Sequence, residues 1–181
     1  MKRFLLIAAA SASLAGCMSA TDDGSSAMSS SMAPGDMTPE DRANYVKMAG
    51  ASDLFEIQSS QLALSRAQRS ETRQYAQMLV THHTQTTQAT VQAARAAGLN
   101  PPPPMLLPMQ QRMMDQLRRA DGARFDQLYF TQQIPAHEMA LALHSNYSRS
   151  GDTPSLRATA ATAVPLVQQH LDEARRMRGT M

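Results

Sequence analysis

The sequence predicts an all-α domain of four long helices, arranged as two antiparallel hairpins that are joined by a long crossover with a short extra helix. Three observations support this fold class. The chain beyond about position 38 is rich in Ala, Gln, Met, Leu and Arg, which favour helices. Apolar residues recur there at alternating steps of three and four, as on one face of a helix. Capping and turn residues interrupt this pattern between the predicted helices.

The first hairpin is bounded by local signals. Its first helix is expected to begin after Thr38, a favourable N-cap residue, with Pro39 in the first turn, and to end near Arg69. The second helix begins after Ser70 and ends at Gly98, because glycine readily adopts the left-handed conformation that closes many helices. Only a tight turn separates the two helices, so they are expected to pack antiparallel.

Residues 99–121 form the long crossover. Its four consecutive prolines, at 101–104, are expected to be extended, and residues 108–119 are predicted to form the short extra helix. A connection of more than twenty residues is long enough to return along the bundle. It therefore favours the ferritin-like order of helices over a simple up-down-up-down order.

The second hairpin consists of predicted helices over residues 123–149 and 154–178, separated by a tight turn. Pro135 and Pro165 lie inside these helices and are expected to kink them, because proline lacks the backbone N–H that a helix uses. Together the two hairpins predict a ferritin-like four-helix bundle over residues 38–181.

The N-terminal residues are typical of an export signal. Lys2 and Arg3 precede a short apolar run, and the small residues after it lead to Leu-Ala-Gly-Cys at 14–17. This motif resembles the lipobox of bacterial lipoproteins. We therefore expect residues 1–16 to be a signal peptide and Cys17 to carry lipid, as a palmitoylated membrane anchor. Because Met18 rather than Asp follows the cysteine, the resemblance implies an outer-membrane lipoprotein with a domain exposed to the periplasm.

Residues 17–37 are predicted to be a flexible tether, because they are rich in Ser, Met and Gly and show no apolar period. Lys2 and Arg3 belong to the expected signal, which leaves 15 of the 17 basic residues against 15 acidic ones. This balance gives no electrostatic reason to expect a nucleic-acid partner. The membrane, through the lipid on Cys17, is the expected partner, and the sequence identifies neither a protein partner nor a homo-oligomer. A single cysteine also excludes an internal disulfide framework.

Four ionisable residues inside the apolar faces are the candidate site. Counting the helical rise from the ends places Glu56, His83 and His137 each roughly 20 Å along the bundle, with His170 within roughly 6 Å of that level. One such group from each long helix would then meet at mid-bundle. Two further residues, His82 and Glu138, adjoin this layer in sequence and are expected to support it from outside.

Two interpretations of this layer are open. The preferred one is a hydrogen-bonded polar core, because buried histidines and carboxylates commonly satisfy one another. The alternative is a site for a divalent transition metal such as Cu, Zn or Fe, which one carboxylate and several imidazoles suit.

The crossover also contains methionines, whose thioethers suit Cu(I). The preferred interpretation is again packing, because Met109 and Met113 lie one helical turn apart. This group comprises Met105, Met109, Met113 and Met114.

Several segments taken in series resemble a known bacterial family. They are Tyr75–Thr84, Gly122–Tyr129, His137, and Pro165 followed by His170-Leu171. Over about residues 40 to 177 the chain is similar to the family called domain of unknown function 4142. The resemblance implies an exported, ferritin-like four-helix protein that is often a lipoprotein. His83 takes the histidine position of the family's Asp-His motif, and His82 replaces the aspartate.

Ferritin-like proteins often hold a di-iron site, so the resemblance requires a test for one. Such a site uses a Glu three residues before a His on each of two helices. Val80 and Val167 stand at those positions, so a ferroxidase is not expected. No arrangement of a nucleophile beside a base is visible either. We therefore expect a non-enzymatic envelope lipoprotein with a binding or stress-related structural role. The alternative is transition-metal binding in the periplasm through the His/Glu layer.

Overall fold

The computed structural model describes residues 39–181, which form five helices. The predicted signal peptide (1–16), the predicted lipidation site Cys17 and the whole predicted tether (17–37) lie outside these residues. The fold prediction is confirmed: the described part is all-α, with two helical hairpins, a long crossover and a short extra helix. No helix within it is both long and apolar enough to span a membrane. The helices are α1 Arg42–Arg66, α2 Ser70–Ala96, α3 Pro108–Arg119, α4 Gly122–Ser150 and α5 Pro154–Arg178.

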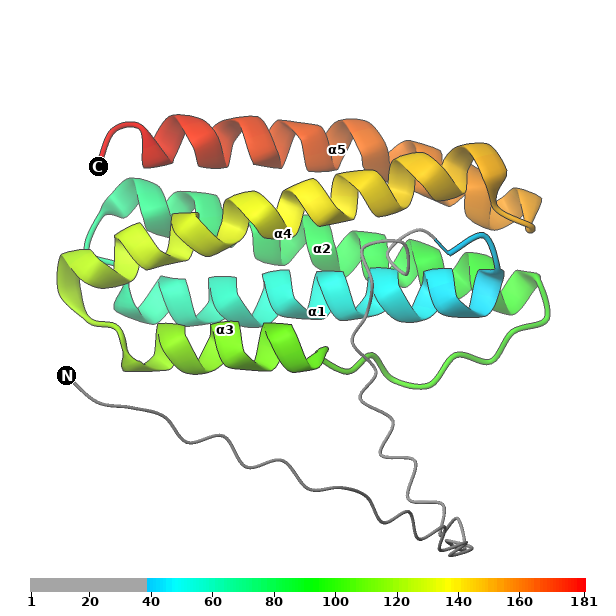
Figure 1. Ribbon diagram of the computed structural model, residues 1–181, viewed down its shortest axis with the longest axis horizontal. Helices are drawn as coiled ribbons and strands as arrows, with labels where there is room; N and C mark the ends of the chain where they lie inside the picture. Colours follow the sequence, from blue (N-terminus) through cyan, green and yellow to red (C-terminus); the bar gives the residue numbers. More distant parts are fainter. Residues whose placement is uncertain (1–38) are drawn as a thin grey trace, which may run out of the picture. The chain divides into compact units, whose positions relative to one another are not determined.

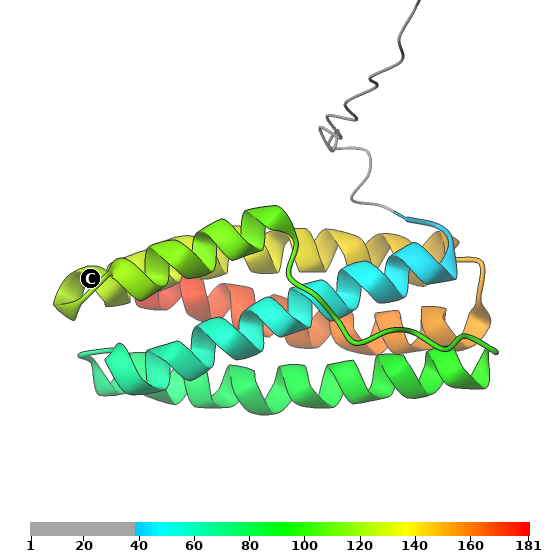
Figure 2. The same cartoon turned by 90° about the horizontal axis from the view of Figure 1, so that it is seen from below.

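The helices are arranged in the ferritin-like order. α1 packs on α2 and α4 packs on α5 within the two hairpins, while α1 also contacts α4 and α2 contacts α5. The crossover returns along the bundle beside α1, so α2 and α4 start at the same end (Figures 1 and 2). Gly50 permits this close approach, because a Cβ at this position would lie 3.1 Å from the side chain of Pro104.

Two predicted helix starts were wrong. α1 begins at Arg42 rather than after Thr38, because the Asp41 side chain accepts a hydrogen bond from the backbone N–H of Asn44 and acts as the N-cap. Ser70 is the first residue of α2 and not its cap.

The turn before α2 is instead held by α4. The buried carboxylate of Asp126 accepts the backbone N–H groups of Gln68 and Arg69, at 3.1 and 2.9 Å. A residue far away in sequence therefore satisfies these donors. Local sequence signals could not have predicted it.

The apolar core forms two clusters, one towards each end of the bundle. Phe125, Tyr129 and Leu79 belong to the first cluster, and Tyr45 and Tyr147 belong to the second. Between the residues of these two clusters lie three buried histidines, namely His83 on α2, His137 on α4 and His170 on α5. The bundle thus has a polar layer between two apolar ones.

Candidate functional site

Three imidazoles converge at this polar layer. His83 on α2, His137 on α4 and His170 on α5 are at most 2% exposed. One ring nitrogen from each lies within 4.8 Å of one from each of the others. The ring centroids are 5.2 to 5.7 Å apart, and the rings meet at 51° to 89° rather than stacking. Three helices therefore direct one imidazole each at a common point.

Each imidazole is held from outside through one of its two nitrogens. Nδ1 of His83 lies 2.8 Å from Oδ1 of Asp53. Nδ1 of His137 lies 2.9 Å from the backbone carbonyl of Gln133, four residues earlier on the same helix. Since a carboxylate and a carbonyl only accept hydrogen bonds, both histidines carry their proton on Nδ1. In the neutral form of each ring, Nε2 then carries a lone pair.

The third imidazole has a histidine as its partner. Nε2 of His170 lies 2.9 Å from Nδ1 of His82, and the two rings stack with centroids 5.1 Å apart. His82 is half-buried, so it lies on the solvent side of this pair. Through His170 it contacts the layer from outside.

Glu56 of α1 reaches the same layer but forms no hydrogen bond there. Its Oε1 lies 3.7 Å from Nδ1 of His137, which is beyond hydrogen-bond distance, and both of its oxygens are buried without a partner. Burial raises the pKa of this carboxyl to about 8, although the nearby charge of His83 opposes the rise. Glu56 is therefore a costly residue to bury in this position.

The four predicted residues do not hydrogen-bond to one another, although each histidine has a hydrogen-bond partner at one of its nitrogens. Nε2 of His83, Nε2 of His137 and Nδ1 of His170 also lack hydrogen-bond partners although they are buried. A polar group buried without a partner destabilises a fold by about 1–3 kcal/mol. The three histidines converge on one point, and neither they nor Glu56 satisfy one another.

Two other predicted or neighbouring residues lie outside the layer. Glu138 was expected to support it, but its side chain is 48% exposed and pairs with Arg175 at 2.7 Å. It follows His137 directly, and consecutive helical residues point about 100° apart. His144 is buried two turns along α4, where its Nδ1 lies 3.1 Å from the hydroxyl of Tyr45.

Asp53 was not predicted from the sequence as part of the site. Its Oδ1 holds His83, and its Oδ2 accepts the hydroxyls of Thr86 and Thr87, at 3.0 and 2.9 Å. A signal was present, because Asp53 stands three residues before Glu56 and so shares its helix face. A carboxylate behind a histidine is the arrangement that commonly orients metal-binding imidazoles.

The protonation preferences of the layer differ from residue to residue. Burial lowers the pKa of His83, but its hydrogen bond to Asp53 and the charges of Asp53 and Glu56 outweigh this and raise the pKa. Burial and the charge of His83 lower the pKa of His137 to about 3. Burial and the neighbouring histidines likewise lower the pKa of His170. His137 and His170 are thus neutral at physiological pH, as metal ligands must be.

Three imidazole nitrogens converge here, shielded from water, and the buried carboxylate of Glu56 lies beside them, with its Oε1 3.7 Å from Nδ1 of His137. This combination suits Zn, Cu and Fe, whereas Ca and Mg prefer oxygen ligands. The orphaned nitrogens and the outer partners of the histidines both fit a metal ion at this point.

Comparison with known proteins places these residues in a family. The family described as "Domain of unknown function (DUF4142)" matches residues 26–177, which include α1 to α4 and nearly all of α5. No curated protein matches the chain.

Solved structures of similar fold include two of CopM. CopM in the Cu(II)-bound form is 17% identical with a TM-score of 0.67, over 77% of this chain and 97% of that one. CopM in the Cu(I)-bound form is 17% identical with a TM-score of 0.66, over 77% and 96%. A DUF305 fragment from Deinococcus radiodurans is 16% identical with a TM-score of 0.68, over 80% and 98%. At these identities the similarity shows a shared helical fold.

Proposed function

Because the chain belongs to the DUF4142 family and brings three imidazoles together inside its bundle, we propose that this domain binds a transition-metal ion. His83, His137 and His170 would supply the three nitrogen ligands. Glu56 would supply an oxygen, and it would release its proton on binding. Asp53, the Gln133 carbonyl and His82 orient the three rings from outside.

The observation that carries this proposal is the set of unpartnered atoms. In each histidine one ring nitrogen has a hydrogen-bond partner. The other ring nitrogen is buried and has no partner. A purely structural core would instead pair these groups with one another or use apolar residues. A bound cation would satisfy the three unpartnered nitrogens at once.

Copper is the first metal to test. The DUF4142 domain shares its fold with CopM, which has been solved in Cu(II)- and Cu(I)-bound forms. The imidazole-rich donor set suits copper independently of that similarity. Zn and Fe(II) use the same donors and form the comparison series.

The burial of the ligands favours storage or buffering of the metal over catalysis. A catalytic metal keeps one coordination position open to substrate. Here the three histidines and Glu56 are at most 2% exposed. Together with the export signal and lipidated Cys17 expected from the sequence, this suggests a non-enzymatic metal-binding lipoprotein of the cell envelope.

The proposal is tested by loading the purified protein with Cu(II), Zn(II) and Fe(II) in separate experiments and measuring retained metal after desalting. We expect about one equivalent of at least one metal, and nitrogen hyperfine splitting in the Cu(II) electron paramagnetic resonance spectrum. Less than about a tenth of an equivalent of every metal would reject metal binding and leave a structural role.

Matched variants locate the site. His83→Gln and Glu56→Gln each remove one proposed ligand, and both should lower metal affinity at least about tenfold. His144→Gln is the control, because His144 is equally buried on α4 but lies outside the layer. Equal losses of metal affinity in all three variants would show that the substitutions act through folding rather than through loss of a ligand.

A further inference from the structure

A small cavity lies between α1, α3 and α4, apart from the His/Glu layer. It has a volume of about 30 Å³ and is lined by eleven residues, none of them charged. A water molecule needs roughly 10–15 Å³ of such space, so the cavity is large enough for a single ion. Four methionines from three helices line it: Met48, Met109, Met113 and Met139.

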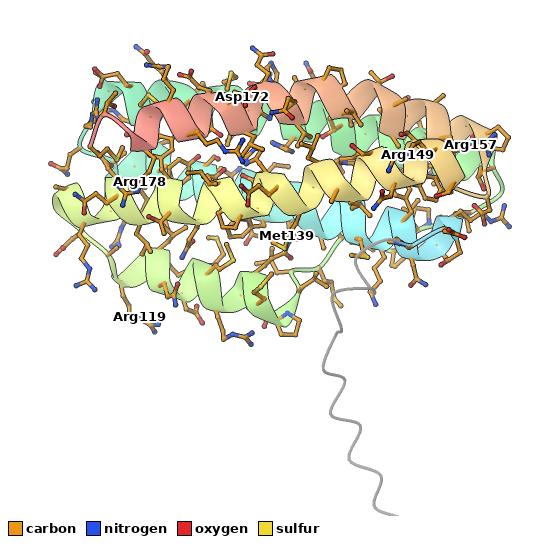
Figure 3. All side chains as sticks on the ribbon, turned by 45° about the horizontal axis from the view of Figure 1, so that its top comes forward. Arg119, Met139, Arg149, Arg157, Asp172 and Arg178 are labelled. Carbon is orange, nitrogen blue, oxygen red and sulfur yellow. The ribbon has the colours of Figure 1, made fainter. Side chains whose placement is uncertain are left out.

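The cavity is close to solvent on one side. Met48 is buried, Met113 and Met139 are half-buried, and Met109 is 40% exposed. Figure 3 labels Met139 on the edge of α4 that faces α3. An ion can therefore approach by way of Met109 without unfolding of the bundle.

The structure separates the crossover methionines into two kinds. Met109 and Met113 line the cavity, whereas Met105 is 78% exposed and Met114 is buried in the core beside Leu117. The packing interpretation from the sequence fits Met114. It does not account for the two methionines that α1 and α4 add around the same small space.

We propose that this methionine cavity binds a soft monovalent metal ion, which is Cu(I) in the cell and Ag(I) as a laboratory probe. Thioether sulfurs are soft ligands that select Cu(I). They are also neutral, so they compensate a single positive charge more easily than a double one in an apolar environment. The ion enters and leaves as Cu(I), so binding involves no electron transfer.

This site is distinct from the His/Glu layer. Phe55 and Ala136 line the cavity, while the next residue on each helix, Glu56 and His137, belongs to the layer. Consecutive helical residues point about 100° apart, so the two sites lie at a similar level on neighbouring faces of α1 and α4. The proposal does not depend on metal binding by the layer.

The test uses Ag(I) titration of the intact protein, with two matched double variants. Met109→Leu with Met113→Leu removes two cavity thioethers, and Met105→Leu with Met114→Leu removes two from the same segment outside the cavity. Leucine has nearly the volume of methionine, so both variants should fold. We expect Ag(I) affinity to fall at least about tenfold in the first variant and to be unchanged in the second. Cu(II) uptake by the layer should be the same in both.

A direct readout avoids any dependence on the variants. In protein labelled with ¹³C at the methionine methyl groups, Ag(I) should shift the resonances of Met48, Met109, Met113 and Met139. Those of Met105 and Met114 should not move. Unshifted cavity resonances, or equal losses of Ag(I) affinity in the two double variants, would overturn the proposal. The Cu(II) measurement would still report separately on the layer.

Discussion

Replacing Glu56 by glutamine should stabilise the metal-free protein while weakening metal binding. Both oxygens of Glu56 are buried without partners, and burial raises the pKa of this carboxyl from its ordinary 4.5 to about 8. Glutamine has nearly the same shape and cannot ionise. The substitution therefore removes the free-energy cost of keeping this buried carboxyl protonated above its ordinary pKa, and it also removes a proposed oxygen ligand.

The size and sign of the effect follow from the pKa. A group whose pKa is raised on folding favours the folded state below its unfolded pKa, and this contribution is lost as pH rises through the folded pKa. Each pKa unit corresponds to about 1.4 kcal/mol. Relative to pH 4, the free energy of unfolding of wild type should fall by about 3 kcal/mol at pH 7 and by about 5 kcal/mol at pH 9 because of Glu56. The Glu56→Gln variant should not show this loss.

The assay is urea unfolding followed by circular dichroism, in the presence of a chelator, at several pH values between 4 and 9. The measured quantity is the difference in free energy of unfolding between Glu56→Gln and wild type, because contributions from other groups largely cancel in it. Glu138→Gln is the control, and this half-exposed carboxylate should contribute less than about 1 kcal/mol at any pH. A Glu56 difference that stays constant within about 0.5 kcal/mol from pH 4 to 9 would refute the reasoning.

Three further predictions concern residues around the layer. Asp53→Asn should lower metal affinity about 10- to 100-fold in a metal competition assay, because it weakens the partner that orients His83, and unchanged affinity would exclude that role. Burial lowers the pKa of His144 to about 4, so wild type should lose about 3 kcal/mol of stability as pH falls from 6.5 to below 4. A His144→Gln variant should not show this loss in urea unfolding. Asp126→Ala should lower the free energy of unfolding by about 2–4 kcal/mol, because the turn before α2 loses two charge-assisted hydrogen bonds, with metal stoichiometry unchanged. A loss below about 0.5 kcal/mol would contradict this role.

Most of the fold could be predicted because its signals are local. The short helix at residues 108–119 and the end of the last helix at Arg178 coincide with the prediction, and Gly98 has the positive φ of 78° expected after a helix. The start of α1 was misplaced by competition between two nearby capping residues, Thr38 and Asp41. Neither helix propensity nor apolar period distinguishes between such candidates.

The candidate site was predictable in position but not in bonding. Helical rise alone brought Glu56 and the three histidines to one level. Whether they would hydrogen-bond to one another depended on ring orientation, which their outer partners decide. Glu138 was misplaced for a related reason, because a residue next to a layer in sequence points to a different face of the helix.

The sequence by itself determined the five helices, their order and the level of the ionisable residues, because these follow from local propensity, apolar period and a fixed rise per residue. The tertiary structure decided which atoms have partners. Asp53, Asp126 and the methionines of α1 and α4 act on residues that are distant in the chain, and only packing brings them together. The unpartnered nitrogens of the layer result from that packing.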